Sequence, residues 1–218
     1  PADVERLSAY FRAGGPKNLG AALDFIAARW SDGGQAAAPT PAPAPEPVPL
    51  FGLFEPACAT PPKTSARALI LFYRSAFLAG DDAPIRALAE NFFARGFATR
   101  AAYVSSLKDG EVVEALRHEI DAHPPDVILN ATAFSARREQ GSALDLADAP
   151  VLQVMLSGAK IEQWREQRRG LSAADLAMNV VLPEVDGRIV TRAISFKREA
   201  SRLENFEYAP ARHEPEAS

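Results

Sequence analysis

Hydroxyl and amide side chains gather where four apolar runs of this sequence end. The runs 68–73, 97–104, 126–130 and 150–155 end in, or are followed by, uncharged polar residues and two cations. The candidate ligand-binding residues at these ends are Arg74, Ser75, Ser105, Ser106, Lys108, Asn130, Thr132, Phe134, Ser135 and Gln153. A set of fixed donors without a carboxylate suits a ligand that displays carboxylates or carboxamides around its edge. Taken singly, Ser, Thr and Asn are ordinary turn and cap residues, so a structural role stays open.

The elements that would position these residues alternate regularly along the chain. Ala68–Tyr73 is a continuous apolar run, typical of a parallel strand that is buried on both faces. Amphipathic helices are predicted from Asp81–Asp82 to about Gly96 and from Asp109 to Ala122, between the strand candidates. This series predicts an α/β fold with a parallel, doubly wound sheet of the flavodoxin or Rossmann kind and right-handed crossovers. Such sheets bind ligands outside the carboxyl ends of their strands, where the candidates would meet.

The end of this domain is predicted to be a β-ribbon. Asp186-Gly187 separates the apolar segments 180–182 and 189–196, a pattern typical of a hairpin. Shorter helices are expected at 161–165 and 172–178. Arg192 and Lys197 lie on the ribbon and would join the candidate ligand-binding set if the ribbon crossed the mouth of the sheet.

The rest of the chain predicts a helical segment, a linker and a tail. Residues 1–32 read as a short helical hairpin broken at Gly14-Gly15-Pro16, and 33–64 as a Pro/Ala-rich linker that includes a short apolar segment at 50–54. The α/β domain then occupies 65–200, and 201–218 forms a polar tail. The chain begins at Pro1, directly in a helical pattern, which indicates a piece of a longer protein.

Composition and motifs exclude several function classes. A net charge of −4 gives no basic footprint for nucleic acid, and no apolar run is long enough to span a membrane. Neither G-x-G-x-x-G after the first strand, G-x-x-x-x-G-K-[ST] nor G-x-S-x-G occurs. Asn130 stands where a phospho-acceptor domain would need aspartate. A single cysteine, Cys58, fits a reducing compartment such as the cytoplasm, and no metal-ligand spacing is present.

An ordered set of short blocks resembles the large subunit of aerobic cobaltochelatase. The blocks are Tyr10-Phe11 with Gly14-Gly15-Pro16, then 73–75, 79–81, 104–109, 130–135, 150–154, Trp164 with 169–172, 182–189 and 191–197. They keep their order over roughly residues 8–200. The magnesium chelatase H-protein family of chlorophyll synthesis is similar more distantly.

This resemblance implies a ligase that forms nitrogen–metal bonds in cobalamin biosynthesis. It would insert cobalt, its substrate metal, into the corrin-type ring hydrogenobyrinic acid a,c-diamide. ATP and magnesium would be used by AAA+ ATPase and adaptor subunits, which agrees with the absence of a phosphate-binding loop here. No base for the ring protons is identified in this chain, which alone would be inactive.

Three hypotheses stay open at this point. The domain contacts the macrocycle through its polar strand ends, or it is a structural or docking module of the chelatase complex. A stand-alone binder of small ligands, of the periplasmic type, is the third, and the ordered blocks argue against it.

Overall fold

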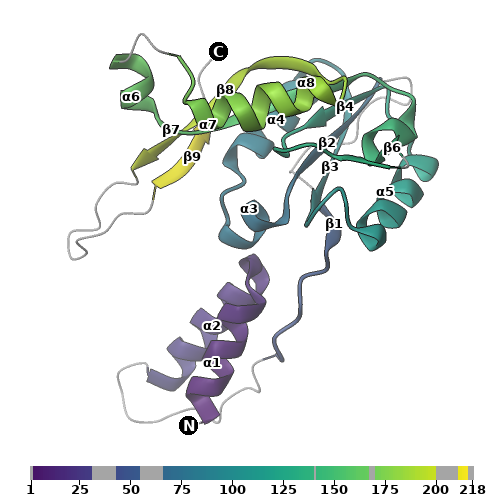
Figure 1. Cartoon of the computed structure of the whole chain (residues 1–218). Coiled ribbons are helices and arrows are strands. Elements are labelled where there is room, and N and C mark those ends of the chain that lie inside the picture. The colour runs from purple at the N-terminus through teal and green to yellow at the C-terminus, as the bar shows by residue number, and fades with distance from the viewer. Residues whose placement is uncertain are drawn as a thin grey trace. The chain divides into compact units, whose positions relative to one another are not determined.

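The computed structural model describes residues 2–30, 43–54, 66–139, 141–166, 170–199 and 211–215. The chain forms two compact units (Figure 1). The helical unit comprises Pro1–Pro49 and Ser75–Gly80, and the α/β unit comprises Leu50–Arg74 and Asp81–Ser218.

The helical unit is the predicted hairpin together with one further helix. Helices α1 (Ala2–Ala13) and α2 (Gly15–Trp30) are separated at Gly14 and Gly15, whose φ angles of 66° and 81° favour glycine. A Cβ atom on Gly14 would lie 3.3 Å from Leu78, so the turn packs closely on α3 (Arg74–Ala79). Helix α3, which follows the first parallel strand without a loop, was not predicted.

Residues 43–49 run along this hairpin and are fixed to it by polar contacts. The Asn18 amide donates to the Glu46 carbonyl (2.7 Å) and accepts from its N–H (3.0 Å). The hydroxyl of the fully buried Tyr10 donates to the Pro43 carbonyl. Part of the predicted linker is therefore ordered against α1 and α2, while 33–42 and 55–64 lie outside the described residues.

The α/β unit is built on one sheet of seven strands in the order β1-β3-β2-β4-β7-β8-β9. The strands are β1 (Phe51–Phe54), β2 (Arg67–Tyr73), β3 (Ala98–Val104), β4 (Val127–Asn130), β7 (Val151–Lys160), β8 (Ile189–Glu199) and β9 (Ala211–Pro215). The five central strands from β3 to β8 pair in parallel, and β1 and β9 add antiparallel edges. Numbered along the chain, the parallel strands have the flavodoxin order 2-1-3-4-5. The predicted parallel, doubly wound sheet is confirmed.

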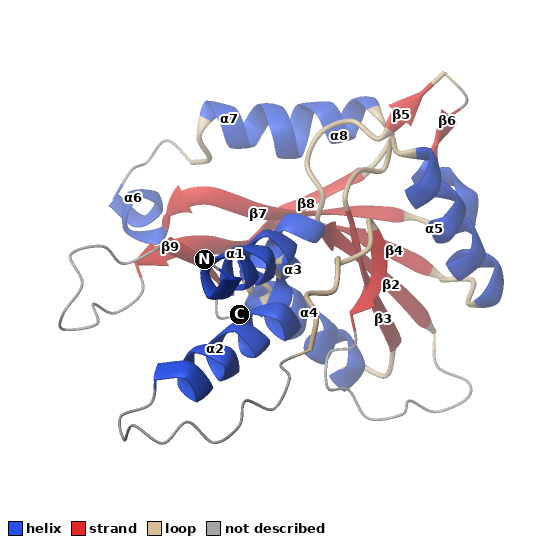
Figure 2. Cartoon of the chain, turned by 90° about the horizontal axis from the view of Figure 1, so that it is seen from below, coloured by secondary structure: helices blue, strands red, loops and turns tan. Residues whose placement is uncertain are grey.

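Helices cover both faces of this sheet. Right-handed crossovers require α4 (Ala83–Ala94) on one face and α5 (Gly110–Ala122) with α7 (Ala173–Leu176) and α8 (Leu182–Val185) on the other. Figure 2 shows α4 and the α7–α8 helix on opposite sides of the strands. The smaller elements are β5 (Arg137–Arg138), β6 (Gly141–Ser142), the 3₁₀ helix η1 (Ala143–Ala147) and α6 (Ile161–Glu166).

The main core lies between the sheet and α5. Leu69 and Leu71 of β2 point to this side and pack with Val112 and Leu116 of α5. Helix α5 forms at this place because the Asp109 side chain caps it, accepting from the backbone N–H groups of Glu111 and Val112. On the opposite face, Phe72 meets Phe54 edge-on, with ring centroids 5.3 Å apart. Successive side chains of β2 thus pack on alternate faces of the sheet, as expected of a strand buried on both faces.

Two local predictions differ from the structure. Asp82 lies at the N-cap of α4, but its carboxylate pairs with Arg86 one turn later (3.0 Å) instead of capping. The predicted hairpin around Asp186-Gly187 is wrong, because 180–182 are helical: α7, the π-helical segment η2 (Ala177–Val181) and α8 form one continuous helix. Gly187 ends that helix with φ 77° and donates to the Glu184 carbonyl (2.9 Å), which is C-cap geometry.

Strand β8 therefore does not form the predicted ribbon. It pairs in parallel with β7, and its antiparallel neighbour is β9, which comes from the predicted polar tail. Val180-Val181-Leu182 is too short a run to distinguish strand from helix by pattern. An Asp-Gly pair serves a helix end as well as a hairpin turn, since both need a left-handed residue.

Replacing Gly52 tests the close packing of β1. The Tyr103 side chain of β3 lies across Gly52, where a Cβ atom would overlap its phenol group. Gly52→Ala should lower the free energy of unfolding by about 1–3 kcal/mol through this overpacking, as measured by urea denaturation. Gly110→Ala is the control, because a Cβ atom there meets nothing within 4 Å. Equal stability of the two variants would contradict the assigned register of β1 on β3.

Candidate functional site

A cleft of about 280 Å³ opens at the carboxyl ends of β2, β3 and β4. Its wall comprises Tyr73, the segment 106–108 after β3 and the segment 132–136 after β4. The chain crosses to opposite sides of β2 at this place, so the cleft occupies the topological switch point where open α/β sheets bind ligands. The structure thus brings together five of the predicted residues: Ser106, Lys108, Thr132, Phe134 and Ser135.

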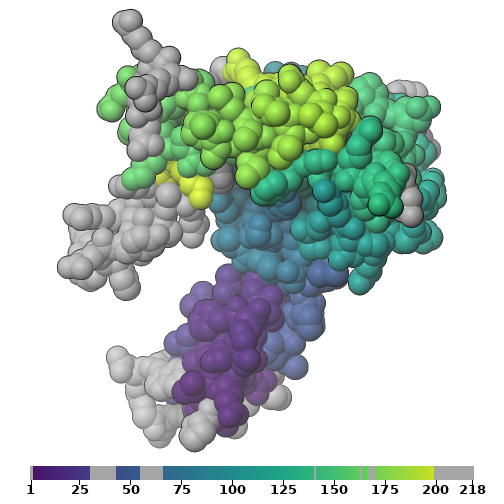
Figure 3. Space-filling model, in the orientation of Figure 1, coloured from purple at the N-terminus to yellow at the C-terminus, as the bar shows by residue number. Residues whose placement is uncertain are grey.

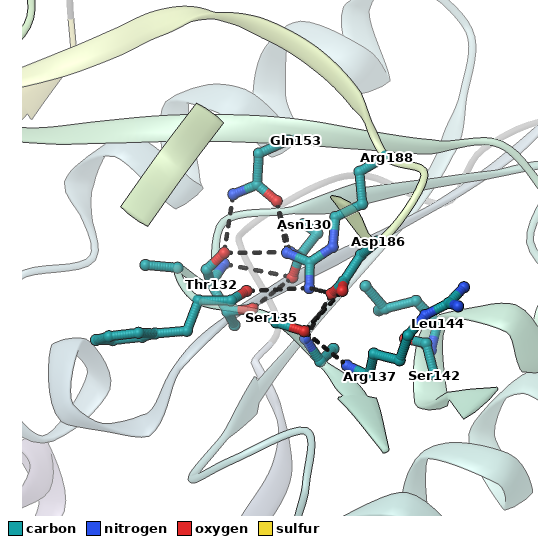
Figure 4. A network of polar contacts seen from close by, with 12 residues as sticks. Asn130, Thr132, Ser135, Arg137, Ser142, Leu144, Gln153, Asp186 and Arg188 are labelled. Carbon is teal, nitrogen blue, oxygen red and sulfur yellow. Dashed lines mark hydrogen bonds and ion pairs between the residues drawn. The ribbon is translucent and has the colours of Figure 1, made fainter. Parts of the chain in front are cut away.

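Three of the predicted residues turn their polar groups toward one another (Figure 4). Asn130 donates to Gln153 Oε1 (2.9 Å), and the Thr132 hydroxyl donates to Asn130 Oδ1 (2.8 Å). Gln153 Nε2 donates to the Thr132 carbonyl (2.8 Å). All three side chains are buried. They hold the loop after β4 in place, so they would influence a ligand by fixing that loop.

Two residues at the centre of this network, Arg188 and Asp186, were not among the predicted site residues. Arg188 is only 5% exposed and connects Gln153 Oε1 (2.8 Å), the Phe134 carbonyl (3.2 Å) and Asp186 Oδ2 (2.9 Å). Two opposite charges two residues apart in the mostly apolar segment 180–190 are the available signal, but in the sequence they resemble part of a hairpin turn.

Asp186 fastens the other end of the same loop. Its carboxylate accepts from the Ser135 hydroxyl and from the Ala136 N–H, both at 2.6 Å. Burial alone would raise the pKa of Asp186, but these hydrogen bonds and the Arg188 guanidinium outweigh it and hold the pKa below its ordinary value. Burial also lowers the pKa of Arg188, against the opposing effect of Asp186. Arginine stays protonated even so, and the two residues form a buried ion pair.

Phe134 is the residue that this network presents to the cleft. Its φ of 65° is unusual for a bulky side chain, and its side chain is 52% exposed although its backbone is held on both sides. The N–H donates to the Met178 carbonyl (3.2 Å), and the carbonyl accepts from Arg188. The phenyl ring is therefore an exposed apolar surface on a fixed backbone.

Tyr73 is a further lining residue that the sequence did not single out. Its hydroxyl donates to the Ala133 carbonyl (2.8 Å), which ties the end of β2 to the loop after β4. Burial raises the pKa of Tyr73, so the phenol stays protonated at neutral pH. Its sequence signals were its place as the last residue of a buried strand and its membership of the block 73–75.

The remaining predicted residues lie elsewhere. Arg74 is half-buried at the end of β2, exposed Ser75 belongs to the helical unit, and Ser105 is half-buried just before the cleft wall. Arg192 and Lys197 lie on β8, two strands from β4 in the sheet. The expectation that their ribbon crosses the mouth of the sheet is wrong, because β8 is itself a strand of that sheet.

The part of the chain that the structure describes holds no cluster of three or more His, Cys, Asp or Glu side chains placed to bind a metal ion. Among the same residues, no helix is long and apolar enough to cross a membrane.

A parallel flavodoxin-order sheet with a polar cleft at its switch point defines a doubly wound α/β domain. Residues 8–217 match the family model described as CobN/Magnesium Chelatase, and the chain belongs to this family. It is 37% identical to the aerobic cobaltochelatase subunit CobN of a Sinorhizobium species over 98% of this chain, and 32% identical to that of Pseudomonas aeruginosa over 94%. A magnesium-chelatase subunit of Cereibacter sphaeroides is 27% identical over 82%.

The chain spans only 18% and 17% of the length of these two CobN relatives. Among solved structures it resembles the catalytic subunit of cobaltochelatase from Mycobacterium tuberculosis. The TM-score is 0.72 at 24% identity, over 92% of this chain and 17% of that one. The family resemblance noted from the sequence blocks is confirmed.

The buried ion pair predicts a pH-dependent effect of Asp186→Asn. Removing one partner of a buried pair should cost about 3–5 kcal/mol in the free energy of unfolding at neutral pH. Because the folded-state pKa of Asp186 is lowered, its stabilisation is complete at neutral pH. That stabilisation is lost as the pH falls below about 4, the value of an unperturbed Asp.

The difference between wild type and variant in urea denaturation should therefore shrink from pH 7 to about pH 3.5. Asp121→Asn, on the exposed side of α5, is the control, and its effect on the free energy of unfolding should be small because an exposed side chain contributes little. A difference for Asp186→Asn that stays constant with pH would contradict the pairing.

Proposed function

We propose that this chain is the part of a CobN-type cobaltochelatase subunit that contacts the macrocycle while cobalt is inserted. The reaction would be the ATP-dependent insertion of cobalt into hydrogenobyrinic acid a,c-diamide in cobalamin biosynthesis. The observation that carries the proposal is Phe134, an exposed aromatic ring that a buried network holds at the switch-point cleft.

The chemistry of the cleft suits such a ligand. A corrin-type ring has broad apolar faces and an edge of carboxylates and carboxamides. The Phe134 ring offers a flat apolar partner for a face, and contacts of this kind contribute about 0.5–1.5 kcal/mol beyond area burial. The exposed ammonium group of Lys108 and the hydroxyl of Ser106 offer donors to the edge.

Removal of the ring N–H protons requires a base, and the described lining of this cleft contains neither a carboxylate nor a histidine. Tyr73 is no substitute, because its pKa is raised. The role of this segment is therefore binding and orientation, and the proton acceptor would come from another part of the subunit.

The energy for insertion would come from partner subunits in the cytoplasm. The sequence has no G-x-x-x-x-G-K-[ST] loop with which to bind ATP. AAA+ ATPase and adaptor subunits would hydrolyse ATP, with its magnesium, and act on the subunit that binds the macrocycle.

The test is a titration of the full-length subunit with hydrogenobyrinic acid a,c-diamide, followed by fluorescence. Phe134→Ala should raise the dissociation constant about tenfold, which corresponds to about 1.4 kcal/mol of lost stacking. Lys108→Ala should raise it up to about fivefold at low salt and less at high salt, because exposed charge pairs are weak and screened.

Arg117→Ala is the matched control, since Arg117 is an exposed cation on α5 that pairs with Glu114 one turn away. It should leave the dissociation constant unchanged. Affinity that is unaltered in both Phe134→Ala and Lys108→Ala would overturn the assignment of this cleft.

A second role, docking within the chelatase complex, is favoured by the orientation of the α7–α8 helix. Its buried side carries Asp175 and Asn179, while Leu176, Val181 and Val185 are 44%, 54% and 69% exposed. This segment contributes to the surface of the α/β unit (Figure 3). An outward apolar stripe with little charge is typical of a surface that another protein covers.

The double substitution Val181→Glu with Val185→Glu tests the docking role. It adds two charges to the stripe and should abolish retention of the chelatase ATPase and adaptor subunits in a pull-down with the full-length subunit, with the melting temperature little changed. Arg117→Glu on α5 changes the net charge by the same amount and should retain them. Loss with both variants, or with neither, would contradict docking through this stripe.

A further inference from the structure

In the helix from Ala173 to Val185, the backbone carbonyl of Met178 accepts a hydrogen bond from outside the helix. In the π-helical segment, the Leu182 N–H donates to the Ala177 carbonyl, five residues earlier. The next residue in this pattern is Pro183, which has no N–H to donate to Met178. Because Leu182 is engaged and Pro183 has no donor, the Met178 carbonyl is free to accept from outside the helix.

The outside donor is the loop after β4. The Phe134 N–H reaches the Met178 carbonyl at 3.2 Å, while Arg188 Nη2 donates to the Phe134 carbonyl at 3.2 Å. The peptide groups on both sides of Phe134 are thus held by partners from one stretch of chain, 178–188.

These two contacts coincide with unusual backbone geometry. Phe134 has a φ of 65°, a left-handed conformation that costs a bulky residue of order 1–3 kcal/mol and persists only where the surroundings impose it. The other non-glycine residue with positive φ in the described part of the chain is Asp148, whose short side chain tolerates the conformation better. The backbone of Phe134 is therefore held in a conformation that a bulky residue disfavours, while Phe134 stays 52% exposed.

We propose that Pro183 and Arg188 are positioning residues for the Phe134 ring. Pro183 acts by leaving the Met178 carbonyl available, and Arg188 acts by holding the Phe134 carbonyl. Together they keep the ring pre-arranged at the cleft, so that a flat apolar ligand face meets it without reordering the loop. The inference deepens the proposed function and rests on it only for the identity of the ligand.

Pro183→Ala separates this mechanism from simple stability. Alanine restores the missing N–H, so Met178 gains a partner within the helix and the Phe134 N–H loses its acceptor. In the full-length subunit we expect amide hydrogen exchange in the peptide 131–136 to become at least about tenfold faster. Arg188→Lys, which removes the forked contact, should accelerate the same peptide. Pro84→Ala is the matched control, because Pro84 stands in the first turn of α4, where no intrahelical bond is missing.

A double-mutant cycle then tests whether Pro183 affects ligand binding through the Phe134 ring. Pro183→Ala alone should raise the dissociation constant for hydrogenobyrinic acid a,c-diamide about five- to tenfold. In a Phe134→Ala background it should add less than about twofold, because its effect passes through the ring. Equal effects in both backgrounds would show that Pro183 acts by another route and would overturn the proposal.

The exchange measurement keeps the two hypotheses distinct. Unchanged exchange at 131–136 in Pro183→Ala overturns the positioning role whatever happens to binding. Faster exchange together with unaltered affinity in both Pro183→Ala and Phe134→Ala supports the positioning role and overturns macrocycle binding at this cleft.

Discussion

The Arg188 guanidinium lies almost completely inside the α/β unit, and an ion in that position needs fixed partners. It carries five N–H donors, and its two terminal nitrogens donate three hydrogen bonds, to Gln153, Phe134 and Asp186. Taking either charge of the Asp186–Arg188 pair out of water is expensive, so the stability of the pair depends on these hydrogen bonds. Those hydrogen bonds tie β7, the loop after β4 and the start of β8 into one arrangement.

The shape of the cleft depends on this constraint. Asp186 holds Ser135 and Ala136, Arg188 holds the Phe134 carbonyl, and Asn130 with Gln153 holds Thr132. The conformation of the loop after β4, which forms one wall of the cleft, is thereby fixed at each residue. The groups that fix it are buried and need no contact with a ligand. A loop fixed in this way can keep an aromatic ring in a strained backbone conformation, because local relaxation would break a buried polar contact.

The sequence predicts the framework of this protein better than its site. Strands such as 68–73 are recognisable because a parallel strand buried on both faces is largely apolar, and Asp109 was predicted as the start of the helix α5, whose N-cap it forms in the structure. The ends of the first three strands were located correctly, but β7 runs on to Lys160 instead of ending near residue 155, and Asn130 and Gln153 face each other rather than the cleft. No local pattern reveals that, since the two residues are 23 positions apart and meet only in the folded sheet. The Asp186–Arg188 pair was missed for a related reason: its partners come from residues 134–136 and 153, and its own neighbourhood resembles a hairpin turn.

The helix from Ala173 to Val185 links the two roles proposed for this chain. Its buried side is polar because Asp175 accepts from the Ser157 hydroxyl (2.8 Å) and the Gly158 N–H (3.2 Å), which fixes the helix to β7. Because polar residues occupy the buried side of this helix, apolar residues lie on its exposed side. The extra residue of the π-helical turn brings Leu176 into line with Val181 and Val185. The same irregular turn exposes the Met178 carbonyl to Phe134. One local departure from α-helical geometry, next to Pro183, therefore accompanies both the outer apolar stripe and the contact that anchors the loop after β4. The surface proposed for docking and the loop that carries Phe134 are thus connected by one helix.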